Sequence, residues 1–225
     1  MLPPLDPDLA TAYFDASTYL IKDSKYTEAL DNMQSGLLIR ERILPKVHPD
    51  IAHSYFQIGE VYFILKDYVS SLRYYEKALP LLKNSLPINN DLLNRIYPKI
   101  DRTKFLVERQ CHIKELQEQL NTLDSQLNYG DDDHAEVYYE IATCYLDLSD
   151  YQNALDYYLE ALELFSFSNI QAKRRTANTI SNVYKKLNNE QKALEYEEYA
   201  NADDEYFLFG FDTFLEFNNY LNNLE

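Results

Sequence analysis

The chain has 225 residues, of which 46% are hydrophobic, and it contains only four glycines and eight prolines. This composition allows a sizeable buried core with few tight turns, which favours an all-α fold. The formal net charge of −16 disfavours a general surface for nucleic acids or anionic membranes, because both need an excess of Lys and Arg.

The first residues, MLPPLDPDL, have neither the positive charge nor the apolar run of a signal peptide, and no apolar stretch is long enough to span a bilayer. The two cysteines, Cys111 and Cys144, are 33 residues apart and each lies in a helical pattern. This arrangement does not suggest a disulfide framework or a CxxC metal pair. We therefore expect a soluble protein of the reducing cytoplasm.

Three stretches of the chain are nearly the same. They are KYTEALDNMQSGL from Lys25, DYVSSLRYYEKAL from Asp67 and DYQNALDYYLEAL from Asp150. The tyrosines at their second positions are 42 and then 83 residues apart, about one period and then two. This spacing predicts a weaker copy between the second and the third.

Each clear copy pairs this stretch with a preceding helical pattern. In SYFQIGEVYFIL, Tyr55, Ile58, Gly59 and Tyr62 fall at i, i+3, i+4 and i+7, the spacing of one apolar stripe on a helix. The following pattern carries the small residue Ser71 where two helices would pack closely. The repeating unit is therefore predicted to be a helical hairpin.

The tripeptide HPD, at residues 48–50, precedes the second copy. J-domain co-chaperones expose this tripeptide between two helices, but no other J-domain feature is present. Pro49 disfavours a helical conformation at His48 and suits the first turn of the next helix. We interpret the tripeptide as a helix start.

Two further copies are weaker. The segment near 94–127 keeps Tyr97 and Ile100 but loses the small residues, although its second half, ERQCHIKELQEQLNTLDSQL, is strongly helical. We interpret it as a degenerate repeat rather than a linker. The segment near 174–203 keeps several repeat positions, including Ser181.

These copies resemble the tetratricopeptide repeat (TPR), whose first helix carries an aromatic fourth and a small eighth residue and whose second helix carries further small residues. The matching positions are Tyr13, Tyr55 and Tyr138 for the fourth, Ser17, Gly59 and Ala142 for the eighth, and Gly36, Ala78 and Ala161 for the twenty-seventh. The resemblance implies an α-solenoid of about five hairpins over residues 1–204, with repeats near 10–44, 52–85, 94–127, 135–168 and 174–203.

The 42-residue spacing exceeds the roughly 34 residues of the usual unit. The junction from Ile39 to Tyr62 is similar to those of kinesin light chains. The heptad coiled coil by which those proteins join their motor is absent from this N-terminus, so motor attachment is not implied.

In TPR proteins, the first helices line a concave groove that holds a peptide. By this resemblance, the first repeat contributes Thr11, Phe14, Asp15 and Thr18. The candidate groove residues of the later repeats are His53, Phe56, Gln57, Glu60, Phe63, Arg95, Lys99, Arg102, Glu136, Tyr139, Glu140, Thr143, Arg175, Asn178, Asn182 and Lys185.

The charges of this set leave alternatives open. Arg95, Lys99 and Arg102 lie on one helical face and either hold a carboxylate or acidic peptide segment or neutralise neighbouring acidic helices. Asn178 and Asn182, one turn apart, either grip a peptide backbone or are simply exposed. The Lys and Asn of the chaperone-binding carboxylate clamp are not reproduced in the first repeat.

The segment 205–225, rich in aromatic and acidic residues, fits an amphipathic helix. It includes Phe207, Phe211, Phe214, Leu215, Tyr220, Leu221 and Leu224. Such a helix is expected to cap the last repeat, to occupy the chain's own groove, or to pair with a second copy.

No motif for catalysis or cofactors is found. The four glycines stand singly, which excludes a phosphate-cradling loop, and His48 and His53 lie on different helical faces. DDDH, at 131–134, lacks the alternating ligands of a calcium loop and is interpreted as a solvated helix start. We expect a non-enzymatic adaptor for an unidentified protein or peptide, without metal or cofactor; the alternatives are a regulatory region or partner of a larger enzyme and a structural oligomer.

Overall fold

The computed structural model describes residues 6–84, 90–124, 132–166, 168–204 and 210–222. All the regular secondary structure in these ranges is α-helical, as predicted, and none of their helices is both long and apolar enough to cross a membrane. The helices are α1 (Pro7–Lys22), α2 (Tyr26–Ile43), α3 (Pro49–Ile64), α4 (Tyr68–Asn84), α5 (Asn90–Asp124), α6 (Asp132–Asp147), α7 (Tyr151–Leu164), α8 (Ile170–Lys186), α9 (Glu190–Asn201) and α11 (Phe211–Asn222).

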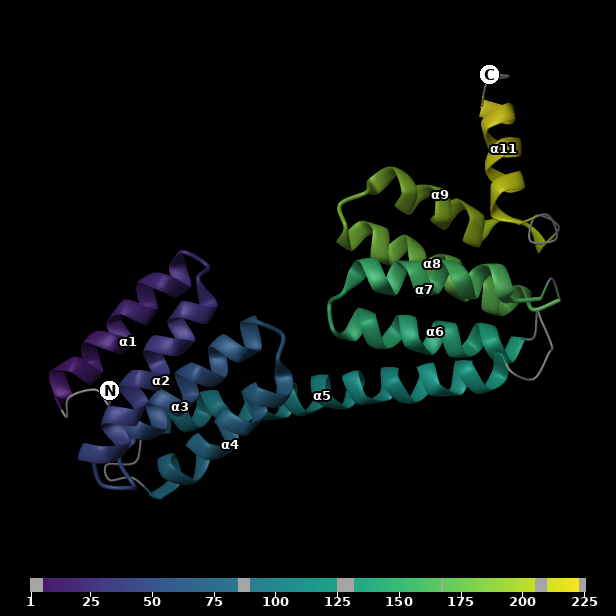
Figure 1. Cartoon of the computed structure of the whole chain (residues 1–225). Helices are drawn as coiled ribbons and strands as arrows, with labels where there is room; N and C mark the ends of the chain where they lie inside the picture. Colours follow the sequence, from purple (N-terminus) through teal and green to yellow (C-terminus); the bar gives the residue numbers. More distant parts are fainter. Residues whose placement is uncertain (1–5, 85–89, 125–131, 167, 205–209, 223–225) are drawn as a thin grey trace. The chain divides into compact units, whose positions relative to one another are not determined.

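Consecutive helices pack as antiparallel hairpins, which Figure 1 shows for α1–α2, α3–α4, α6–α7 and α8–α9. Neighbouring hairpins stack through α2 against α3 and through α7 against α8. The chain divides into two compact units, residues 1–107 and 108–225, and each contains two of these hairpins. The repeated sequence thus corresponds to a repeated structural unit in both halves.

A buried hydrogen bond closes three of the hairpins at equivalent positions. In each case a serine hydroxyl on one helix donates to a backbone carbonyl on its partner, twelve residues away along the chain. The pairs are Ser17 with the carbonyl of Ala29 at 3.1 Å, Ser71 with that of Gly59 at 2.9 Å, and Ser181 with that of Ala193 at 2.7 Å. The small residues of the repeat pattern therefore allow close approach and also satisfy buried polar groups.

Gly59 shows how tightly the helices approach each other. A Cβ atom at this position would lie 2.7 Å from the ring of Tyr75, which is fully buried in the same hairpin. Only glycine avoids this overlap, because any other side chain begins with that atom. Tyr158, at the equivalent position of the fourth repeat, is buried in the same way.

Each of the four hairpin turns places one non-glycine residue in the left-handed region. These are Ser24, Lys66, Ser149 and Asn188, with φ between 56° and 60°. In two of the hairpins the next residue caps the second helix: Asp67 accepts from the Ser70 amide, and Asn189 accepts from the Lys192 amide. The turn geometry repeats although the residue that adopts it does not.

The HPD tripeptide starts a helix, as predicted. His48 is the N-cap of α3 with an extended backbone, and its Nδ1 accepts a hydrogen bond from the Asp50 amide at 3.1 Å. Pro49 occupies the first turn, where its missing amide leaves no carbonyl unpaired.

The segment near 94–127 differs from the expected hairpin because α5 is one continuous helix of 35 residues. Its first part packs as a repeat helix would, with Leu92, Ile96 and Ile100 in a core cluster with Tyr75 and other residues of α3 and α4. From residue 99 to 124 the chain has no glycine or proline, so nothing in this stretch stops the helix. We therefore replace the expected hairpin by a single helix; residues 125–127 lie outside the described ranges.

The C-terminal helix α11 caps the last hairpin. Phe211 stacks on Tyr196 of α9, with ring centroids 4.0 Å apart, and Phe214 packs against Tyr199 at 5.3 Å. The first turn of α11 therefore covers an aromatic surface of the last repeat. Of the other predicted members of this face, Phe207 and Leu224 lie outside the described residues.

Candidate functional site

The predicted groove residues of the first unit lie on α1, on α3 and on the first part of α5. On α1, Thr11, Asp15 and Thr18 are exposed. On α3 and the first part of α5, the residues His53, Gln57, Glu60, Arg95 and Lys99 are all at least partly exposed. Their common face is the surface on which the resemblance places a ligand.

Two of the predicted aromatic groove residues, Phe14 and Phe56, are core residues instead. Phe56 is 2% exposed and Phe14 is 5% exposed. Arginines cover their rings, with the guanidinium of Arg95 5.2 Å from the Phe56 centroid and that of Arg40 4.3 Å from the Phe14 centroid. The prediction that Phe14 and Phe56 line the groove is corrected: their rings are buried, and the guanidinium groups of Arg40 and Arg95 pack over them.

Lys99 is neutralised within the unit. Its ammonium lies 3.0 Å from Oε2 of Glu60, and the hydroxyl of the buried Tyr75 donates to the other oxygen of that carboxylate. The same ammonium lies 5.2 Å from the ring centroid of Phe63. Glu60 and Lys99 thus form a connected ion pair on the face.

Arg95 and Arg102 are exposed on α5, seven residues apart and therefore on one side of the helix. The guanidinium of Arg102 lies 5.4 Å from the Phe105 centroid. The pKa of His53 on the adjacent α3 is lowered, first by desolvation and then by the positive charges of Arg40 and Arg95. Burial and the neighbouring arginines thus disfavour the protonated form of His53.

The corresponding face of the second unit is formed by α6 and α8. Here one guanidinium nitrogen of Arg175, Nη2, donates to both carboxylate oxygens of Glu136, at 2.9 and 2.8 Å, and the guanidinium lies 4.1 Å from the Tyr139 centroid. The tyrosine hydroxyl lies 3.4 Å from the Thr179 hydroxyl on α8. The structure therefore brings Glu136, Tyr139 and Arg175, predicted separately, into one rigid cluster.

Behind this cluster, Thr143 extends the contact between helices. Its hydroxyl donates to the Tyr139 carbonyl at 2.9 Å and lies 3.0 Å from the hydroxyl of Tyr158. Glu140, on the same helix, is exposed. Lys185 forms an ion pair with Glu197 of α9 at 2.6 Å, so its charge is also compensated.

Asn178 and Asn182 are exposed, one turn apart on α8. Neither side-chain amide takes part in a hydrogen bond within the described part of the chain. Arg175, one turn before Asn178, is held by Glu136 and Tyr139. The face therefore combines a fixed charged cluster with two amides that remain available for a ligand.

The other motifs of the sequence have structural roles. Asp131 lies outside the described residues. Asp132, the first residue of α6, accepts from the Ser166 amide at 2.8 Å and from the Asn169 side chain at 2.8 Å. These bonds connect the start of α6 to the connection between α7 and α8, and they lower the pKa of Asp132. No group of three or more His, Cys, Asp or Glu side chains that would suit a metal ion occurs in the described ranges.

Comparisons with known proteins identify the repeats. A tetratricopeptide repeat profile matches residues 8–84 and 118–200, more than half of the chain. No curated protein matches the sequence.

Similar solved structures include the MamA protein, at 16% identity over 86% of this chain and 90% of that one, with a TM-score of 0.36. A putative kinesin light chain from Podosopora anserina with nearly identical TPR-like repeats has 13% identity, covers 87% and 95%, and has a TM-score of 0.40. A Rap protein complexed with competence and sporulation factor has 20% identity, covers 84% and 51%, and has a TM-score of 0.39. At these identities the similarity concerns the helical-repeat fold alone.

Proposed function

Because this chain belongs to the tetratricopeptide repeat family, whose repeats mediate protein–protein interaction, we propose that it is a non-enzymatic adaptor that binds a peptide or partner segment. The ligand lies along the exposed faces of the first helices of the hairpins. In the second unit this face is on α6 and α8, and in the first unit it is on α3 and the first part of α5. We further propose that the protein acts in the cytoplasm, which is consistent with its two free cysteines.

The availability of Asn178 and Asn182 carries this proposal. An amide side chain can donate to a peptide carbonyl and accept from a peptide N–H at the same time. Two amides one turn apart can therefore hold an extended backbone at two points without reading its side chains. Little ordering entropy is lost at the neighbouring Arg175, because Glu136 and Tyr139 already fix it.

The exposed arginines of the first unit give the proposal a second, charge-selective element. Arg95 and Arg102 present guanidinium groups on a face where Glu60 is already paired with Lys99. Guanidinium groups form short, directional hydrogen bonds with carboxylates. We therefore propose that acidic segments of the ligand contact this face.

The experiment begins with peptides selected from a random displayed library against the full chain. The double variant Asn178→Ala, Asn182→Ala is expected to weaken the binding of selected peptides about tenfold or more, because two ligand hydrogen bonds are lost. The matched control is Gln152→Ala, Asp156→Ala, which removes an exposed pair with the same spacing on α7. It is expected to leave binding unchanged.

A second arm tests the arginines with acidic members of the selected set. Arg95→Glu together with Arg102→Glu is expected to abolish their binding and to leave neutral peptides bound. Lys99 is retained in this variant, since removing it would leave Glu60 unpaired. Selected peptides that bind both double variants as tightly as they bind the unmodified protein would contradict the proposed faces.

A further inference from the structure

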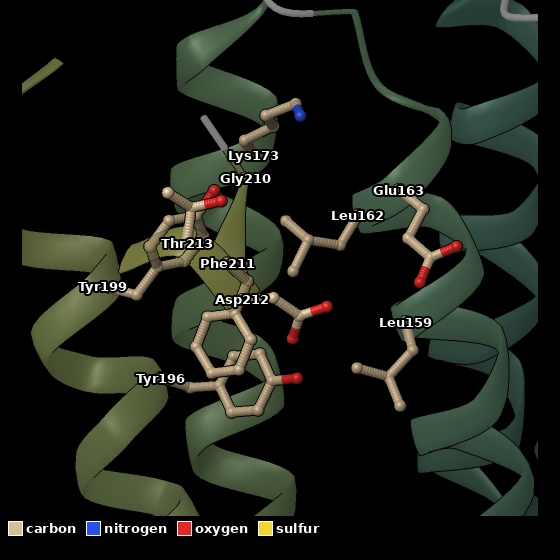
Figure 2. A pocket seen from close by; sticks show the side chains of 10 residues that line it. All are labelled: Leu159, Leu162, Glu163, Lys173, Tyr196, Tyr199, Gly210, Phe211, Asp212 and Thr213. Atoms are coloured by element: carbon tan, nitrogen blue, oxygen red, sulfur yellow. The ribbon is translucent and has the colours of Figure 1, made fainter. Parts of the chain in front are cut away.

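A cavity of about 440 Å³ lies between α7, α8, α9 and the start of α11, entirely within the second unit. Figure 2 shows its lining, with Leu159 and Leu162 opposite the rings of Tyr196 and Phe211. The capping helix thus leaves a partly open space beside the last repeat, and Glu163, Asp212 and Thr213 in its lining are exposed. Nothing in the repeat pattern predicts this cavity, because α11 lies outside the repeats.

Tyr196 brings a hydroxyl to the cavity that makes no hydrogen bond within the described residues. The residue is 7% exposed, and its ring is held by stacking on Phe211 at 4.0 Å and on Tyr184 at 5.6 Å. In Figure 2 its hydroxyl points into the space below Asp212. Because the cavity leaves this hydroxyl accessible, a ligand can bind to it in place of water.

Two carboxylates stand near this hydroxyl. Asp212 and Glu163 both line the cavity, and their negative charges add to burial in raising the pKa of Tyr196. Figure 2 places the Asp212 carboxylate between the Tyr196 ring and Leu159. A ligand at this end of the cavity therefore meets negative charge and an acceptor oxygen.

The lining also includes one cation, Lys173. It is 5% exposed, and its pKa is lowered by burial, which outweighs the opposite effect of Asp132, a residue that does not line the cavity. In the view of Figure 2 its amine lies at the end away from Tyr196.

We propose that this cavity binds an organic cation, a guanidinium or primary ammonium group carried on an aliphatic stem. The cationic N–H groups donate to the Tyr196 hydroxyl and to the Asp212 carboxylate, with Glu163 adding to the negative field. The stem lies along Leu159, Leu162 and the face of Phe211, where apolar contact and the aromatic rings favour it. This site is separate from the proposed peptide-binding faces and does not depend on them.

The test compares two probes of the same shape, n-butylguanidinium and the neutral n-butylurea. Binding to the full chain is followed by the resonances of labelled tyrosine rings, with that of Tyr196 assigned from the spectrum of Tyr196→Phe. The cation is expected to shift this resonance and to bind at least about tenfold more tightly than the urea, the ratio for one charge-assisted hydrogen bond. Equal binding of the two probes, or no shift at Tyr196, would overturn the proposal.

Two variants test the assigned contacts. Asp212→Asn is expected to weaken n-butylguanidinium binding about tenfold, whereas Glu160→Gln, an exposed carboxylate on α7 outside the cavity, is expected to have no effect. Equal weakening by both variants would mean that the cation binds non-specifically to the acidic surface. That result would refute the assignment of binding to the cavity.

The source of the cation is identified by a third probe, N-acetyl-arginine methylamide. If it binds as n-butylguanidinium does, the cavity accepts an arginine side chain of a partner protein. If only n-butylguanidinium binds, the ligand is a small free cation. With either outcome for this third probe, Asp212→Asn must still weaken the binding of n-butylguanidinium for the proposal to hold.

Discussion

The hairpin turns use residues that adopt the left-handed conformation at different cost. Ser149 and Asn188 occupy equivalent turns of the second unit with φ of 58° and 56°. Asparagine tolerates this region because its side chain bonds locally, whereas serine has no such advantage. Ser149→Gly is therefore expected to raise the free energy of unfolding by about 0.5–1 kcal/mol, and Asn188→Gly by less.

Urea unfolding of the two glycine variants checks this ordering. Ser149→Ala serves as the control, because alanine keeps the strain of a Cβ atom at positive φ. A loss of stability on Ser149→Gly, or a larger gain at Asn188, would show that the serine makes a contact that offsets the strain.

At the scale of the elements, Asp132 connects two hairpins through Ser166 and Asn169. Its carboxylate only accepts hydrogen bonds, whereas the amide introduced by Asp132→Asn would turn an NH₂ group toward one of these donors. The substitution is therefore expected to cost about 1–2 kcal/mol at pH 7. Because these bonds hold the folded-state pKa below its usual value, their contribution is present above the unfolded pKa and is lost as pH falls through the folded one.

Urea unfolding at pH 7, 5 and 3 therefore has a defined outcome. The difference between the unmodified protein and Asp132→Asn is expected to be constant from pH 7 to 5 and to shrink toward pH 3. Asp133→Asn, the exposed neighbour in the same helical turn, is expected to show no such pattern. A difference that stays constant down to pH 3 would contradict the role of the ionised carboxylate.

The capping helix gives a second prediction at this scale. Phe214 is 7% exposed and packs on Tyr199, so Phe214→Ala is expected to release α11 and to remove the amide-exchange protection of its first turn. Thr213→Ala, at an exposed position of the same turn, is the control. Hydrogen exchange measured by mass spectrometry distinguishes them, and unchanged protection in Phe214→Ala would show that the helix does not depend on this contact.

Deletion of residues 206–225 extends this test to the alternatives raised by the sequence. We expect lower solubility, because the rings of Tyr196 and Tyr199 lose their cover. A soluble protein that binds peptides more tightly would instead support self-inhibition. A mass that rises with concentration only when this segment is present would support self-association through it.

At the scale of the whole molecule, the charge is distributed unequally. Residues 108–225 contain 24 Asp and Glu against 8 Lys and Arg, whereas residues 1–107 contain 13 of each. Self-repulsion is therefore concentrated in the second unit and is screened by salt. Raising NaCl from about 0.02 to 0.3 M, across the range in which the Debye length falls below about 10 Å, is expected to increase exchange protection in α8 and α9 more than in α3 and α4. An equal response of the two hairpins would contradict this assignment.

Sequence reasoning recovered those features that local patterns determine. The small residues at Gly59 and Ser181 predicted the hairpins, and Pro49 predicted the start of α3. The uninterrupted α5 was not predicted, since the degenerate copy retains the period but has no glycine or proline between Pro98 and residue 124 to end the helix.

Features that depend on packing between hairpins could not be predicted from the sequence. The ion pair of Arg175 with Glu136 joins residues 39 positions apart and forms only when α8 lies beside α6. Phe56 was placed in the groove because its position in the repeat is known, but its ring fills the core beneath Arg95. The cavity beside Tyr196 arises where a non-repeating helix meets a repeat, so no periodic signal reports it.

The continuity of α5 has a practical consequence for anyone who wishes to express the halves of this protein separately. A cut at the boundary between residues 107 and 108 falls in the middle of the helix. Each product would then have a new helix end with unpaired backbone N–H or C=O groups. Overlapping fragments, 1–124 and 90–225, would each keep the complete helix. Such a pair allows the peptide preferences of the two faces to be measured one at a time.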